Sequence, residues 1–179
     1  SEFENNGITV HLSLENFDVD KTIKLLKSIG INNVRVEIKW QSIGGQNADE
    51  YNFDYCDPMM ESFKKNGIKP IVILGAPNSY FGESDRMDSE EDVRKYLKYI
   101  KGVVEHYDWV ENFEIMNEPN GKYGDDEGTT WYAKAVQEAK KIIGDKNVYA
   151  GATVLTGSEK FLTDISKKGA YDSSDYYSF

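Results

Sequence analysis

The residues best suited to chemistry are the stretch Asn-Glu-Pro-Asn at 117–120, which directly follows a short apolar run at 110–116. An apolar run of this length predicts a buried strand, so Glu118 is expected where that strand ends. A carboxylic acid at the mouth of a barrel strand suggests chemistry on sugars. The sequence reaches Phe179 without a second strand-end carboxylate of this kind, so half of the usual catalytic pair is expected outside this chain.

The elements that must position Glu118 are short β-type runs alternating with amphipathic helical stretches. In the second run, Val34, Val36 and Ile38 share one face while Arg35 and its alternating neighbours share the other, which is the period of a strand. Helix starts and stops are marked by capping residues, of which the pair Ser89 and Asp92 resembles a capping box. The predicted strands cover 8–12, 33–40, 70–74, 110–116, 148–153 and 175–179. Helices are predicted to begin at Asp18, Asp57, Ser89, about Thr130 and Ser158, with Asp18 and Ser158 as N-caps. The segment Gly121 to Gly128 is predicted to be a loop.

This order, β(αβ)5, predicts an α/β fold with a parallel sheet of βα units. A doubly wound sheet and a (β/α)8 TIM barrel both fit it. No Gly-x-Gly-x-x-Gly follows the first strand and no phosphate-binding Gly-Lys-Ser/Thr loop is present, which disfavours a dinucleotide-binding or flavodoxin-like sheet. Nothing in the composition marks an internal boundary, so residues 1–179 are expected to form one domain.

Charge and composition narrow the classes of ligand. Lys and Arg number 21 against 31 Asp and Glu, and the resulting net charge of −10 opposes binding to nucleic acid or to anionic membranes. No apolar run is long enough to span a membrane. A lone Cys56, two histidines and no His-Glu-x-x-His leave little material for a metal site, and no cofactor is predicted.

The chain resembles the retaining glycoside hydrolases of clan A, and most closely the xylosidase and iduronidase-like family thirty-nine. The resemblance runs nearly end to end and implies the N-terminal portion of a (β/α)8 TIM barrel, here about six strands and five helices. Its most specific motif is the one around Asn117 and Glu118. The matching segments, in chain order, are 34–37 with Trp40, 73–77, 113–120 and 175–179.

The resemblance implies roles for individual residues. Glu118 would be the general acid that protonates the glycosidic oxygen and then the base that activates water. Asn117 would bond the 2-hydroxyl of the sugar, and Arg35 would lie near the nucleophile and keep it ionised. The alternative for Arg35 is an interior charge paired with Glu37 or Glu114. His11 is a candidate for binding a sugar hydroxyl, with a structural role as the alternative.

Three aromatic residues near the expected site are candidates for stacking on sugar faces. They are Trp40, Tyr80 and Phe81, and for each of them packing in the core is the alternative.

One departure from the family bears on activity. A retaining enzyme needs a second carboxylate about 5 to 5.5 Å from the first, and in this clan it is a Glu that ends strand seven. The nucleophile is therefore expected outside this chain, in a C-terminal part that completes the barrel, either in the same polypeptide or as a separate chain. This chain alone is expected to be inactive, and a carbohydrate-binding pseudoenzyme or inactive fragment is the alternative. Residues 1–3 resemble a cloning scar, and the expected location is extracellular, with an oligo- or polysaccharide as substrate.

Overall fold

A computed structural model describes residues 7–10, 18–81, 84–154 and 157–178. Six strands form one sheet in the order β1-β2-β3-β4-β5-β6, and every neighbouring pair is parallel. Sequential order with parallel pairing is the connectivity of a (β/α)8 barrel, whereas a doubly wound sheet would reverse its strand order at a switch point. The strands are β1 (Gly7–Val10), β2 (Asn33–Lys39), β3 (Lys69–Gly75), β4 (Asn112–Ile115), β5 (Asn147–Ala150) and β6 (Tyr176–Tyr177).

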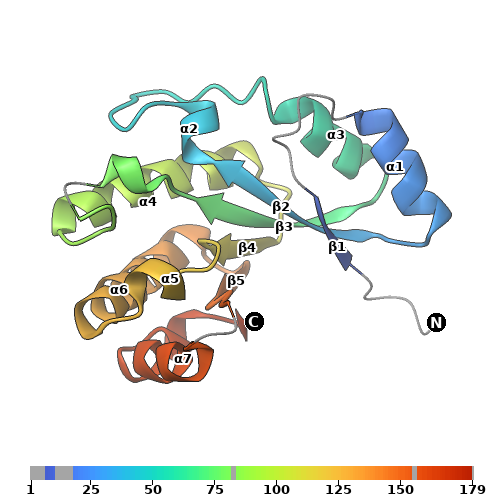
Figure 1. Ribbon diagram of the computed structural model, residues 1–179. Coiled ribbons are helices and arrows are strands. Elements are labelled where there is room, and N and C mark those ends of the chain that lie inside the picture. The colour runs from blue at the N-terminus through green and yellow to red at the C-terminus, as the bar shows by residue number, and fades with distance from the viewer. Residues whose placement is uncertain (1–6, 11–17, 82–83, 155–156, 179) are drawn as a thin grey trace.

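Five longer helices connect the strands and lie around the outer side of the curved sheet (Figure 1). They are α1 (Val19–Ser28), α3 (Asp57–Lys65), α4 (Glu90–His106), α6 (Asp126–Ile143) and α7 (Ser158–Lys167). Two single-turn helices, α2 (Trp40–Ile43) and α5 (Asn120–Tyr123), follow β2 and β4, and the 3₁₀ turns are Asn78–Tyr80 and Tyr171–Ser173. The predicted fold class, an incomplete TIM barrel of six strands and five crossover helices, is confirmed.

The predicted helix caps hold in two of the best-marked cases. The Asp18 side chain accepts a hydrogen bond from the Lys21 backbone N–H at 2.9 Å, and Ser89 accepts one from Asp92 at 3.2 Å. Each bond satisfies one of the backbone N–H groups that a helix N-terminus leaves without an intrahelical partner. Gly144 ends α6 with a φ of 70°, a conformation that favours glycine.

Several predicted boundaries were wrong, including those of β2, α6 and α7. Strand β2 ends at Lys39, and Trp40 instead begins the short helix α2. Helix α6 begins at Asp126 rather than near Thr130, because the Asp125 side chain accepts a hydrogen bond from the Gly128 N–H at 2.6 Å and caps the helix earlier. The N-cap of α7 is Gly157 rather than Ser158, whose hydroxyl bonds the Val154 carbonyl instead.

The two faces of the sheet differ in polarity. On the outer face, Val34, Val36 and Ile38 are almost completely buried and belong to the hydrophobic core. On the inner face, Arg35 alternates with these residues and remains partly exposed. The apolar core therefore lies between sheet and helices, and the inside of the barrel offers charged groups to a ligand.

The short strand β6 is tied to β5 by Asp175. Its carboxylate accepts hydrogen bonds from the Val148 N–H at 2.8 Å and from the Lys140 Nζ at 2.9 Å. These two bonds, the backbone one first, hold the pKa of Asp175 below its usual range. The start of β6 therefore depends on an ionised carboxylate as well as on its few ladder bonds.

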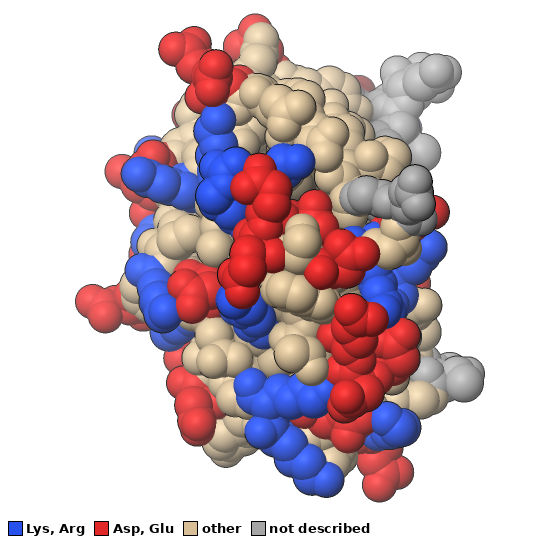
Figure 2. Space-filling model, turned by 90° about the vertical axis from the view of Figure 1, so that its left-hand side faces the viewer, with Lys and Arg blue, Asp and Glu red and all other residues tan. Residues whose placement is uncertain are grey.

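On the surface shown in Figure 2, acidic and basic side chains lie close together. Ion pairs join neighbouring helices, as between Lys134 of α6 and Glu90 of α4. Lys168, beyond the end of α7, pairs with Asp126 at 2.7 Å. Within the described residues, no helix has both the length and the apolar character needed to cross a membrane.

Candidate active site

Buried tyrosines fix the carboxyl ends of three strands, where the site residues lie. Tyr99 of α4 donates its hydroxyl proton to the Ile38 carbonyl of β2, and Tyr96 donates to the Leu74 carbonyl of β3 at 2.7 Å. Tyr132 of α6 donates to the Ile115 carbonyl of β4 at 2.8 Å. Each hydroxyl supplies a partner for a carbonyl near the point where the sheet ends, so the strand ends are held by the helices behind them. Burial raises the pKa of all three phenols well above the ordinary value, so they remain protonated donors.

The backbone at the end of β4 is strained. Met116 and Glu118 have φ values of 61° and 50°, and Ala152 beyond β5 has a φ of 28°. Residues other than glycine rarely adopt a positive φ, and they keep it only where surrounding contacts hold the backbone in place. The Glu118 N–H donates to the Ala152 carbonyl at 3.0 Å, which joins the two strained segments. This turn places the Glu118 side chain in an exposed position beyond the strand end.

An ion pair lies directly beneath this turn, inside the barrel. The Arg35 guanidinium of β2 bonds the Glu114 carboxylate of β4 through Nε, at 3.1 and 3.2 Å, and through Nη2. Nη2 also donates to the Asn117 Oδ1 at 2.6 Å, and the Ser178 hydroxyl donates to Glu114 at 3.3 Å. The predicted alternative for Arg35, a pair with Glu114, is therefore present. Of the pair, the Glu114 side chain is 2% exposed and the Arg35 side chain 28%.

Two cavities open beside Glu118, and both are lined by Asn117 and Glu118. The larger, of about 360 Å³, also reaches Arg35, Glu114, Tyr149, Thr153 and Ser178. The smaller, of about 180 Å³, lies toward β3 and includes Glu37 and Phe81. Together they provide a recess with charged and amide side chains in its lining, at the carboxyl ends of the strands, where barrel enzymes bind substrates.

Loop contacts stabilise the rim of this recess. Asn120 makes two reciprocal hydrogen bonds with the backbone of Val154, each 3.1 Å long, and so joins the segments after β4 and β5. Arg86, from the segment before α4, bonds Asp125 at 2.8 Å and the Lys122 carbonyl at 3.0 Å. Two hydrogen bonds lower the pKa of Asp125. The larger effect comes from the capping bond donated by the Gly128 N–H, and the second comes from the bond donated by Arg86.

The aromatic candidates are not grouped around Glu118. The Trp40 ring is completely buried and stacks on Tyr99 at a centroid distance of 5.2 Å, so its predicted role in stacking on a sugar is replaced by packing in the core. Tyr80 meets the Trp40 ring edge-on at 5.1 Å and bonds the Gly44 carbonyl at 3.0 Å. Only Phe81 of the three lines one of the two cavities, and it is 2% exposed. His11 lies outside the described residues.

Several residues of the recess were not predicted from the sequence. Tyr149, Ala152 and Thr153 line the larger cavity from the segment that contains β5, and Ser178 lines it from the end of β6. The available signal was the alternation along β5, where buried Val148 is followed by Tyr149 on the opposite face. Strand periodicity therefore marks Tyr149 as an inward residue, although it does not indicate contact with Glu114 or Glu118.

Tyr132 provides a test of how the strand ends are held. Its hydroxyl donates to Ile115 and also accepts a hydrogen bond from the Gly151 N–H at 3.1 Å, so it joins the ends of β4 and β5. We expect Tyr132→Phe to lower the free energy of unfolding by about 1–3 kcal/mol, because both buried backbone groups lose a partner. Denaturant unfolding measures this loss. Tyr171→Phe, at a residue that is 68% exposed, is the control, and equal stabilities of the two variants would contradict the role of Tyr132.

The chain is similar in sequence and fold to known glycosidases. The chain is 28% identical to a glucan 1,3-beta-glucosidase of Lachancea kluyveri, over 68% of the chain and 31% of the relative. It is 24% identical to a beta-xylosidase of Geobacillus stearothermophilus, over 69% of the chain and 28% of the relative. The structure of a family 39 glycoside hydrolase from Bacteroides cellulosilyticus WH2 superposes with a TM-score of 0.78 and 22% identity, covering 96% of this chain. The chain spans about a third of the length of these proteins.

The family model that matches the chain is Cellulase (glycosyl hydrolase family 5), over residues 1–174. Together with the family 39 structure, this match confirms the predicted resemblance to clan A glycoside hydrolases and to the N-terminal portion of their barrel. The match covers nearly the whole chain, including the β4 motif with Asn117 and Glu118. The chain belongs to the cellulase family, glycosyl hydrolase family 5.

Proposed function

We propose that the complete protein is a retaining glycoside hydrolase that cleaves O-glycosidic bonds in an oligo- or polysaccharide, with Glu118 as its acid/base. The observation that carries this proposal is the position of Glu118. It is exposed at the end of β4, on a strained turn held by Ala152, and it borders a cavity that Arg35 also lines. Family membership and the glycosidase names of the relatives support the same reaction class.

In this mechanism Glu118 acts twice. As an acid it donates its proton to the glycosidic oxygen while the bond to the anomeric carbon breaks, and the second carboxylate takes the sugar as a covalent intermediate. As a base it then removes a proton from the water that attacks this intermediate, which releases the sugar with its original anomeric configuration. An acid/base that protonates an incoming substrate must be accessible, as Glu118 is.

Asn117 is oriented to bind the substrate. A guanidinium group has only donors, so the Asn117 atom that faces Arg35 at 2.6 Å is its oxygen. The amide N–H groups of Asn117 are therefore directed away from Arg35 and can donate to a sugar hydroxyl, for which we propose the 2-hydroxyl. Arg35 holds Asn117 in this orientation and is proposed to lie beside the nucleophile as well.

The nucleophile is proposed to be a Glu outside residues 1–179, on strands that close the barrel between β6 and β1. Apolar side chains exposed at both ends of the sheet support this proposal, because further strands and helices would cover them. At the N-terminal end these are Ile8 of β1 with Leu25 and Ile29 of α1 and its C-cap, which are 46%, 58% and 55% exposed. At the other end they are Tyr171, in the turn before β6, and Tyr176 of β6, at 68% and 51%. The closing strands belong either to the same polypeptide or to a separate chain.

The stereochemistry of the product tests the retaining mechanism. We expect the complete enzyme to release a sugar from an aryl β-glycoside as the β-anomer first, with the α-anomer appearing only by later mutarotation. Proton NMR during the first turnovers distinguishes the two, since the anomeric protons have separate signals. Initial release of the α-anomer would show an inverting enzyme, in which the two carboxylates are farther apart, at about 6.5–9.5 Å.

A further inference from the structure

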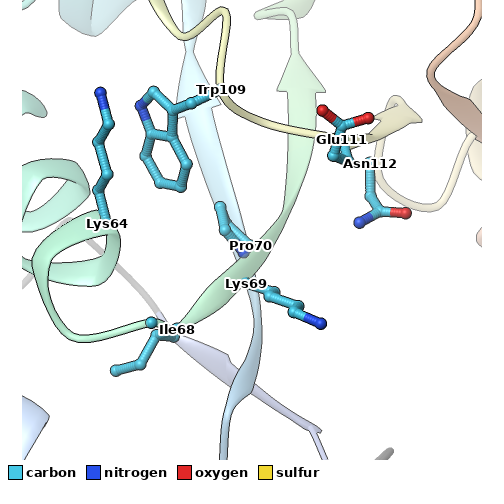
Figure 3. A pocket seen from close by; sticks show the side chains of 8 residues that line it. Lys64, Ile68, Lys69, Pro70, Trp109, Glu111 and Asn112 are labelled. Atoms are coloured by element: carbon cyan, nitrogen blue, oxygen red, sulfur yellow. The ribbon is translucent and has the colours of Figure 1, made fainter.

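A pocket separate from the two cavities beside Glu118 lies at the opposite, amino-terminal ends of the strands. Its volume is about 280 Å³, and it is formed by the end of α3, the start of β3, and the segment that leads from α4 into β4. Figure 3 shows the Trp109 ring facing this space, with Lys64 on one side and Glu111 and Asn112 on the other. Its size is at the lower end of small-molecule sites, at about 300 Å³, which suits one ring with its substituents.

The pocket combines an aromatic face with hydrogen-bonding groups of both kinds. Trp109 is half-buried, and the Lys64 Nζ lies over its ring at 5.8 Å from the centroid. Lys69 and Glu111 are exposed, and within the described residues their side chains make no hydrogen bond. The Asn112 oxygen accepts a bond from Asn147 at 2.9 Å, which leaves its amide N–H groups to donate.

We propose that this pocket is an accessory binding site for one pyranose unit of a glycan. A pyranose presents C–H groups that pack on an indole face and hydroxyls that both donate and accept hydrogen bonds. Glu111 provides the acceptor, while Asn112 and Lys69 provide the donors. The pocket is lined by a carboxylate, Glu111, as well as by two lysines, which disfavours phosphate because phosphate is bound by clustered cations. The choice of a glycan over another polar ring rests on the proposed function.

This site is separate from the recess around Glu118, because it lies at the amino-terminal ends of β3 and β4 and shares no lining residue with it. In a barrel enzyme that face ordinarily serves stability. A sugar-binding site there would hold a long glycan on the protein while another part of it occupies the recess, which raises the local substrate concentration.

Trp131 on α6 offers a matched control. Like Trp109 it is half-buried, with a lysine over its ring, Lys134 at 5.7 Å from the centroid. It lies outside the pocket. Replacing either tryptophan removes an indole and a cation–π contact of about the same geometry, so a difference in glycan binding between the two variants is due to the pocket.

The test uses the complete enzyme carrying Glu118→Gln, labelled with ¹⁵N at its tryptophan indoles and titrated with cellohexaose and with xylohexaose. The Trp109 signal is assigned by its loss in Trp109→Ala. We expect this signal to shift saturably with at least one of the two sugars, and we expect Glu111→Gln to weaken that titration by about tenfold. Trp131→Ala should leave the titration unchanged. A Trp109 signal that stays fixed with both sugars up to about 10 mM overturns the proposal, because any such site would be weaker than millimolar.

Hydrolysis assays separate this proposal from the proposed function. With an aryl monoglycoside, too short to reach both sites, Trp109→Ala should retain the activity of the unmodified enzyme. With a polysaccharide at low concentration, the same variant should lose about tenfold in kcat/KM. A shifting Trp109 signal in an enzyme with no hydrolytic activity would support the accessory site while refuting the proposed function. The converse result would refute only the accessory site.

Discussion

Glu118→Gln in the complete enzyme is expected to lower kcat on natural glycosides by about 10²–10⁴-fold, the usual contribution of a positioned general acid. Glutamine keeps the size and hydrogen-bonding capacity of the side chain but has no proton to transfer. Because Glu118 is exposed and its fixed contact is made by its backbone N–H, the substitution should leave the fold intact. Equal unfolding midpoints for the variant and the unmodified enzyme check this assumption.

The dependence on the leaving group makes this test specific. A dinitrophenolate departs without protonation, so cleavage of a dinitrophenyl glycoside should be nearly unaffected in its first step by the loss of the acid. An alkyl or sugar alcohol needs the proton, so its glycosides should show the full loss. Rates for a series of aryl glycosides, plotted against the leaving-group pKa, should therefore fall more steeply for Glu118→Gln than for the unmodified enzyme.

Glu127→Gln is the matched control, since Glu127 is an exposed carboxylate at the start of α6 whose contact with Arg86 is long, at 3.4 Å. It changes the net charge by the same amount as Glu118→Gln and should leave the leaving-group dependence unchanged. If Glu118→Gln had the same small effect on every substrate as Glu127→Gln, Glu118 would not be the acid/base. Another group would then have to protonate the leaving group.

The sequence allowed the prediction of features that depend on local periodicity and capping. The alternation of Val34, Arg35 and Val36 gave the strand and its inward face, because a pleated strand directs neighbouring side chains to opposite sides. The apolar run before Asn117 placed Glu118 at a strand end. These features follow from the nearest neighbours in the chain, so they could be predicted without knowing the tertiary structure.

Contacts between distant segments could not be predicted in the same way. Helical spacing does not show that the Tyr132 hydroxyl meets the carbonyl of Ile115. Nor does it show that Asn120 bonds Val154, 34 residues along the chain. For Trp40 the same signals suit packing and sugar stacking, and only the position of the Tyr99 ring decides between them. Features of the site that depend on how helices pack behind the sheet require the structure.

The pair of Arg35 and Glu114 joins residues 79 positions apart and affects both stability and activity. Glu114→Ala is expected to lower the free energy of unfolding by about 3–5 kcal/mol, because it leaves the Arg35 guanidinium in the barrel without its carboxylate. We expect the loss of stability to lie in the lower part of this range, because the Arg35 side chain is 28% exposed and water can partly solvate its charge. For a domain of this size the loss corresponds to a fall in Tm of about 6–15 °C, which calorimetry measures.

The double variant Arg35→Met/Glu114→Leu separates the two roles of this pair. Replacing both charges by apolar groups of similar volume avoids an unpaired charge, so the double variant should be more stable than Glu114→Ala. Its activity should nevertheless remain low, because Asn117 has lost the donor that orients its side chain. If Glu114→Ala unfolded at the same temperature as the unmodified protein, the pair would not stabilise the barrel. If the double variant recovered full activity, the orientation of Asn117 would not depend on Arg35.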